Sequence, residues 1–120
     1  MTLDPAVAAL SALAHPGRLG VFRLLVKAGP CGLAAGDIAR AMDSLPNTLS
    51  NNLNILSSAG LVASRREGRS VVYTAAYDRM RDLLAFLIED CCSGDASICA
   101  PLADLVQRSA CCATEAVDPA

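Results

Sequence analysis

The stretch that decides the fold is Ser44-Leu-Pro-Asn-Thr-Leu-Ser-Asn-Asn-Leu-Asn-Ile-Leu-Ser-Ser-Ala-Gly60. Its leucines recur at spacings of 4, 4 and 3 residues, which predicts a helix with one apolar face. Gly60 is placed to end that helix. Asn is a poor residue for a helix interior, so three asparagines on a second, uncharged face indicate a use other than stability. The apolar face carries Leu45, Leu49, Leu53 and Leu56, and the polar face carries Asn47, Asn51, Asn54 and Ser58.

Three helices are expected before this stretch. Asp4-Pro5 supplies an N-cap and a first helical position, so a first helix begins there and ends just before Pro16. Pro16 starts the second helix, and Gly29-Pro30 ends it. Residues 32–36 then form a linker and residues 37–42 a short helix. The expected apolar positions are Val7, Leu10 and Leu13 in the first helix, and Leu19, Phe22, Leu25 and Val26 in the second.

A β-hairpin and a last helix are expected after this stretch. Residues 61–66 and 69–74 are short strand-like runs around the turn sequence Glu67-Gly68. Asp78 caps a long helix that ends around Cys91–Ser93. The order of elements predicts a mostly α fold with a small β-hairpin, a winged helix-turn-helix. The expected apolar positions of the last helix are Met80, Leu83, Leu84, Leu87 and Ile88.

Composition and charge narrow the class of protein. The chain has 120 residues, one domain's worth, and 53% of them are apolar. No apolar run approaches the roughly 18 residues that a membrane span needs, and the N-terminus lacks a secretion signal, so we expect a cytoplasmic protein without membrane contact. Residues 1–81 carry nine basic and five acidic side chains, whereas residues 82–120 carry one and seven. The first part is therefore the one suited to nucleic acid.

The short helix and the polar-faced helix fit a helix-turn-helix, whose second helix enters the major groove of double-stranded DNA. Asn can bond adenine with two hydrogen bonds, and a Thr methyl can pack on a thymine methyl. No Arg or Lys lies on this helix, so we expect it to favour A·T pairs. Arginines around the hairpin turn supply the charge that a wing needs to contact phosphates. The candidate DNA-binding residues are Asn47, Thr48, Ser50, Asn51, Asn54, Arg65, Arg66 and Arg69.

Five short motifs follow one another along the chain. They are Ala12-Leu-Ala-His-Pro-Gly-Arg-Leu19, Asp37-Ile-Ala39, Leu49-Ser-Asn-Asn-Leu53, Ala59-Gly-Leu-Val62 and Arg66-Glu-Gly-Arg69. As an ordered set they resemble the ArsR/SmtB family of winged-helix repressors, over about residues 5–90. One departure concerns Asn52, where the family often has His, and it leaves the target sequence open.

The resemblance implies a homodimer packed through its first and last helices. It also implies an operator with two-fold symmetry, bound without any cofactor, and repression that ends when an inducer binds. We expect residues 1–92 to form the winged helix-turn-helix DNA-binding and dimerisation domain. Residues 93–120 are then a cysteine-containing C-terminal tail.

Cysteine is concentrated at the C-terminal end, where five of the six cysteines fall within 22 residues. In a reducing compartment such a cluster indicates metal binding or thiol chemistry rather than disulfides. Thiolates select soft ions, and trivalent arsenic bonds three of them in a pyramid, whereas zinc wants four ligands in a tetrahedron. Three donors on one short stretch, with Gly94 to end the helix, suit a pyramidal site within one chain. These donors are Cys91, Cys92 and Cys99.

The same segment resembles the arsenic-responsive subgroup that has Cys-Cys and a nearby third Cys after the final helix. The resemblance assigns ligand roles to Cys91, Cys92 and Cys99 and makes As(III) the inducer, with Sb(III) and methylarsenite as alternatives. The Cys-x-Cys pair that other members carry on the third helix is absent. Cys31 is expected to be structural, and Cys111 and Cys112 have no assigned role.

Other interpretations of the cysteines stay open at this stage. The thiols could sense oxidants or persulfides, or hold zinc with Cys111 or Cys112 as a fourth ligand, or simply fill space at a helix end. A thiol-transfer or metal-buffering module is the alternative outside transcription. An enzyme is not expected, because the chain has one histidine, His15, no clustered acid–base pair and no glycine-rich phosphate loop.

Overall fold

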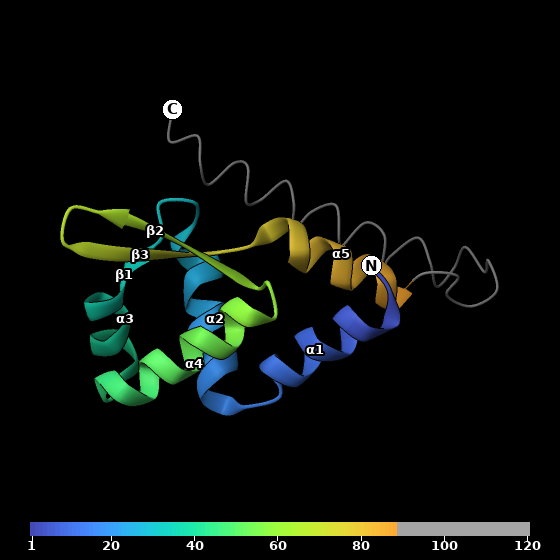
Figure 1. Cartoon of the computed structure of the whole chain (residues 1–120), viewed down its shortest axis with the longest axis horizontal. Coiled ribbons are helices and arrows are strands. Elements are labelled where there is room, and N and C mark those ends of the chain that lie inside the picture. The colour runs from blue at the N-terminus through green and yellow to red at the C-terminus, as the bar shows by residue number, and fades with distance from the viewer. Residues whose placement is uncertain (89–120) are drawn as a thin grey trace.

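A computed structural model describes residues 1–88 and shows a mostly α fold with a small sheet. Figure 1 shows the tip of the hairpin, α3 and the start of α4 at one end, and α1 and α5 at the other. This confirms the predicted winged helix-turn-helix architecture, whereas the predicted boundary at residue 92 and the tail at 93–120 lie outside the described residues. The elements are α1 (Leu3–Leu13), α2 (Pro16–Ala28), β1 (Leu33–Ala34), α3 (Ala35–Met42), α4 (Pro46–Ser58), β2 (Val62–Glu67), β3 (Ser70–Ala75) and α5 (Tyr77–Ile88).

Two of the helix boundaries follow directly from residues with special backbone behaviour. Pro16 is the first residue of α2, as predicted, because its missing N–H is not needed there. Gly60 follows α4 with a φ of +77°, and its N–H donates to the Ser57 carbonyl at 2.9 Å. The next N–H, of Leu61, donates to the Leu56 carbonyl at 3.0 Å. This pair of bonds is a Schellman motif, which confirms Gly60 as the end of the helix.

The sheet has three antiparallel strands in the order β1-β3-β2. The predicted hairpin is confirmed, but its turn is Gly68-Arg69 rather than Glu67-Gly68, because Glu67 still pairs with Ser70. Gly68 has a φ of +64° and Arg69 does not have a positive φ, which is the pattern of a type II′ turn. This turn favours glycine at its first central position. The strand β1 lies in the segment predicted as a linker, and Leu33 pairs with Tyr73. A two-residue strand leaves no periodic pattern, so only its distant partner defines it.

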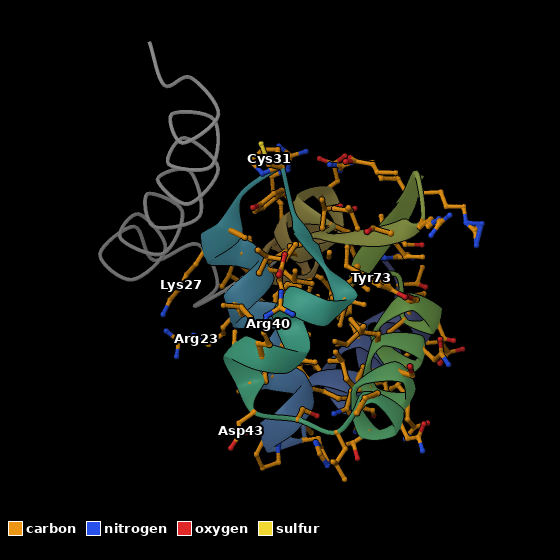
Figure 2. The ribbon with its side chains drawn as sticks, turned by 90° about the vertical axis from the view of Figure 1, so that its left-hand side faces the viewer. Arg23, Lys27, Cys31, Arg40, Asp43 and Tyr73 are labelled. Carbon is orange, nitrogen blue, oxygen red and sulfur yellow. The ribbon has the colours of Figure 1, made fainter. Side chains whose placement is uncertain are left out.

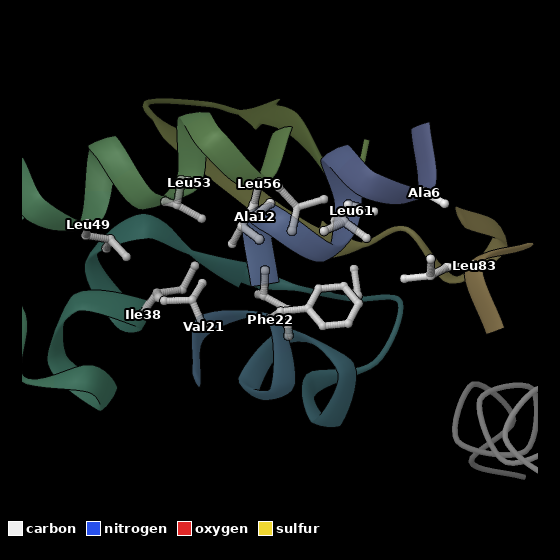
Figure 3. Close-up of a cluster of buried hydrophobic side chains, with 14 residues drawn as sticks. Ala6, Ala12, Val21, Phe22, Ile38, Leu49, Leu53, Leu56, Leu61 and Leu83 are labelled. Atoms are coloured by element: carbon white, nitrogen blue, oxygen red, sulfur yellow. The ribbon is translucent and has the colours of Figure 1, made fainter. Parts of the chain in front are cut away.

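The hydrophobic core lies among α1, α2, α3 and α4 and extends to Leu83 of α5 (Figure 3). Leu49, Leu53 and Leu56 point from α4 into this core and are nearly fully buried. Burial of each leucine side chain stabilises the fold by about 1.5–3 kcal/mol, so α4 is held firmly in one orientation. Their partners from the other helices include Val21, Phe22, Leu25 and Ile38.

Several other residues that were predicted on buried helix faces are exposed in the structure, and these predictions are wrong. In α1 the buried residues are Ala6, Ala9 and Ala12, because their small side chains let the helix approach its neighbours closely. Val7 and Leu10 are instead 52% and 41% exposed. Also exposed, contrary to the predicted faces, are Leu19, Leu45 and Leu87.

Two predicted N-caps are also wrong. The helix α1 has Thr2 at its N-cap, and α5 begins at Tyr77, so Asp4 and Asp78 lie in the first turns of their helices. An acidic side chain is favourable there because it faces the positive end of the helix dipole. Within residues 1–88, no helix is long and apolar enough to cross a membrane.

Candidate nucleic-acid interface

The helix pair α3–α4 is joined by the three residues Asp43, Ser44 and Leu45. Asp43 ends α3 with a φ of +49°, a left-handed conformation that Asp and Asn tolerate better than most residues. Leu45 is extended and precedes Pro46, the first residue of α4. This tight turn brings the N-terminus of α4 to the surface at the end of the molecule that carries α3.

The predicted polar residues of α4 are all exposed. They lie on the side of the helix away from the buried leucines, so the core fixes which side chains point outward. The N-terminus of a helix also presents free N–H groups and a partial positive charge, both of which favour a phosphate or a base edge. The exposed residues are Asn47, Thr48, Ser50, Asn51 and Asn54.

Of the three hairpin arginines, Arg65 is held by the protein itself. Its Nε–H donates to Glu67, and its Nη2–H donates to the Cys31 carbonyl at 2.8 Å. Neighbouring residues of a strand point to opposite faces, so Arg66 lies on the other face from Arg65. Arg66 and Arg69 are exposed, and within residues 1–88 neither guanidinium has a hydrogen-bond or ion-pair partner. Side chains of the hairpin and of α4 project on the same side of the molecule in Figure 2.

A buried polar side chain that the sequence did not predict lies on the core side of α4. Asn52 is only 6% exposed, and a Cβ atom added to Gly17 would lie 3.1 Å from its Nδ2 atom. The side chain therefore packs against the N-terminus of α2. His15 is the N-cap of α2, where its Nδ1 accepts the N–H of Gly17 at 3.1 Å and of Arg18 at 3.4 Å.

Asn52 therefore bears on how α4 packs against α2 rather than on base contact. Its spacing could have revealed this, because residues 49, 52, 53 and 56 follow the i, i+3, i+4, i+7 pattern of a buried face. His15 could have been predicted as a cap only from its position before a proline that starts a helix.

Charged groups of α3 border the same end of the molecule (Figure 2). Arg40 forms an ion pair with Asp37 one turn earlier, so its charge is partly neutralised. Asp43 is exposed beside the start of α4. A carboxylate there opposes the approach of a phosphate, whereas Arg66 and Arg69 on the hairpin are exposed and have no ion-pair partner among residues 1–88.

The cysteines predicted to bind the inducer, Cys91, Cys92 and Cys99, lie outside the described residues, as do Cys111 and Cys112. Cys31 is exposed in the turn between α2 and β1 as a free thiol. Residues 1–88 contain no group of three His, Cys, Asp or Glu side chains that could hold a metal ion. The cysteine site therefore remains a prediction from the sequence.

Comparison with known proteins agrees with this architecture. A family model described as a helix-turn-helix domain matches residues 13–65. A biofilm growth-associated repressor from Agrobacterium fabrum is 30% identical over 89 residues, which cover 74% of each chain. The solved winged helix-turn-helix domain of Mb0332 from Mycobacterium bovis, described as a possible ArsR-family regulator, is 35% identical with a TM-score of 0.60. That alignment covers 71% of this chain and 77% of the solved one.

The chain belongs to the ArsR/SmtB family of winged helix-turn-helix transcriptional regulators. Another relative is the transcriptional regulator MT0088 from Mycobacterium tuberculosis, which is 35% identical over 74 residues. Those residues cover 61% of this ArsR/SmtB-family chain and 62% of MT0088. The relatives are named as regulators and repressors rather than enzymes, in agreement with the expectation from the sequence.

Proposed function

We propose that this ArsR/SmtB-family protein is a repressor that binds a two-fold symmetric operator in double-stranded DNA as a homodimer. One observation carries this proposal: the start of α4, which carries the exposed and uncharged polar row, and the tip of the hairpin that carries Arg66 and Arg69 lie at the same end of the fold. The first can contact base edges in the major groove, and the second can contact the phosphates beside it. The core leucines behind α4 hold the row in a fixed orientation, which sequence readout requires.

Exposed apolar side chains at the opposite end support the homodimer. Val7 and Leu10 of α1 and Leu87 of α5 are large, apolar and open to solvent. The two helices contact each other at the end farthest from the hairpin tip (Figure 1). Exposed apolar surface of this kind is typical of a protein interface. The M. bovis relative is described as homodimeric, and a two-fold dimer would present two copies of α4 to successive major grooves.

We further propose that trivalent arsenic is the inducer and that Cys91, Cys92 and Cys99 bond it. The proposal rests on the sequence: arsenous acid can exchange its hydroxyl groups for three thiolates, and this segment supplies three within nine residues. The segment follows α5, so bonding there would act next to the proposed dimer interface. A coupling of about 1–3 kcal/mol between inducer and DNA is typical of allosteric proteins.

The test begins with the full chain and a library of random double-stranded DNA, kept under a non-thiol reductant. We expect selection of a palindromic sequence, bound with an affinity that falls steeply with salt. Weak binding without sequence preference would contradict the repressor and favour a thiol-transfer or metal-buffering module.

Arsenite is then titrated into the complex. The wild type should release the operator. The variants Cys91→Ser, Cys92→Ser and Cys99→Ser should bind the operator with wild-type affinity and stay bound when arsenite is added. The matched control is Cys31→Ser, which should still respond. Antimonite, methylarsenite, zinc and a persulfide donor are tested in parallel. Release by one of these and not by arsenite would replace the inducer but leave the repressor in place.

A further inference from the structure

Leu45 is the most exposed large apolar side chain of residues 1–88, at 73%. The spacing of the leucines predicts it on the buried face of α4, one turn before Leu49. In the structure it lies outside the helix, at the N-cap, with an extended backbone. It therefore contributes nothing to the core that holds the other three leucines.

Helix capping does not explain Leu45 either. Ser, Thr, Asp and Asn are the favoured N-cap residues because their side chains accept an N–H of the first turn, and Leu is among the poorest. The α4 N-cap has no side-chain hydrogen bond. Leu45 is therefore neither buried nor capping, and its side chain is available for a contact outside residues 1–88.

The position of Leu45 indicates what that contact is. It immediately precedes Pro46, Asn47 and Thr48, at the end of α4 that the proposed function directs into the major groove. This end lies opposite α1 and α5, where the homodimer is proposed (Figure 1). Asp43, labelled in Figure 2, lies on the same turn. The neighbours of Leu45 on α4 are uncharged, so the surface around it suits a base edge better than a phosphate.

We propose that Leu45 is a specificity-determining residue that packs on the C5 methyl group of a thymine in each half-site. The isopropyl group of Leu neither donates nor accepts a hydrogen bond, and the thymine methyl is the apolar group that the major groove displays. This inference rests on the proposed DNA-binding function and extends it. Burial of one methyl group corresponds to about a fourfold change in affinity for each half-site.

The experiment replaces each thymine of the selected operator in turn by 2′-deoxyuridine, which removes the methyl group and keeps the base pair. At one position in each half-site, replacement of that single thymine should lower the affinity of the wild type about fourfold. Leu45→Ala removes the contact from both half-sites, so the homodimer should bind the thymine operator about 16-fold more weakly and show no further loss when that thymine is replaced, as in a double-mutant cycle. Ala is as poor an N-cap as Leu, so the thermal unfolding of the variant should be unchanged.

The matched control is Arg69→Ala, which should weaken binding equally to the thymine and deoxyuridine operators. If Leu45→Ala binds as tightly as the wild type, or loses affinity on deoxyuridine as the wild type does at every position, the role of Leu45 is wrong while the repressor stands. Failure to select any operator contradicts the proposed function and the role of Leu45 together.

Discussion

The hairpin arginines allow a quantitative test of whether the hairpin contacts the phosphates of DNA. Arg69 is exposed at the turn, whereas Arg65 is tied to Glu67 and to the Cys31 carbonyl. Each phosphate contact changes the slope of log affinity against log salt by about 0.9. In a homodimer, Arg69→Ala removes two such contacts, so the slope should become shallower by about 1.8. Between about 50 and 200 mM salt, the wild type should therefore lose about 12-fold more affinity than the variant.

The measurement is fluorescence anisotropy on the selected operator across a salt series. Arg66→Ala should behave like Arg69→Ala, because Arg66 is also exposed and without a partner among residues 1–88. Arg65→Ala is the matched control on the same strand and should leave the slope nearly unchanged. All three variants should have their unfolding curves recorded first. Equal slopes for Arg65→Ala and Arg69→Ala would refute the inference that Arg69 contacts a phosphate whereas the hydrogen bonds of Arg65 keep it from doing so.

Three further predictions concern stability. Gly32→Ala should lower the free energy of unfolding in urea by about 2–5 kcal/mol, because Gly32 has a φ of +71° and an added Cβ would lie 2.3 Å from a β3 carbonyl oxygen. Gly68 has a φ of +64° but open space around it, so Gly68→Ala should lower that free energy by only about 1–2 kcal/mol. Burial raises the pKa of Tyr77 above 10.0, so the folded state keeps a proton that the unfolded state releases, and stability should fall as the pH rises through 10. Tyr77→Phe should lose about 0.5–1.5 kcal/mol at neutral pH and show less of this decline. Asp43→Asn should gain about 0.3–1 kcal/mol in thermal unfolding, because it keeps a tolerated left-handed residue and removes a carboxylate from the C-terminus of α3; unchanged melting would contradict this.

The sequence predicts well where a single residue controls the local backbone. Pro16 starts a helix because its ring fixes φ, and Gly60 ends one because it adopts a positive φ without strain. The polar face of α4 was equally predictable, since helical spacing alone separates Asn47, Asn51 and Asn54 from the buried leucines. These features depend on a few neighbouring residues, and neighbours are what a sequence shows.

Features that depend on distant partners were not predictable. The strand β1 exists because Tyr73 of β3, forty residues later, pairs with Leu33. The buried face of α1 is its alanine face, because close helix packing selects small residues over the more hydrophobic Val7 and Leu10. The state of Arg65 depends on a carbonyl 34 residues away. Spacing within a segment carries no information on any of these contacts.

The joint between β3 and α5 has a mechanical consequence. Only Ala76 separates the strand from the helix, and its N–H donates to the Leu61 carbonyl at 2.8 Å. The Tyr77 hydroxyl donates to the Val26 carbonyl at 3.1 Å, which clamps the same joint to α2. A six-residue strand is about 20 Å long, so each degree of tilt at this joint shifts the hairpin turn by about 0.3 Å. Because no loop lies between β3 and α5, a small rotation of α5 would tilt the hairpin as well. A rotation of a few degrees would move Arg69 by about 1 Å, which is enough to break a hydrogen bond to a phosphate.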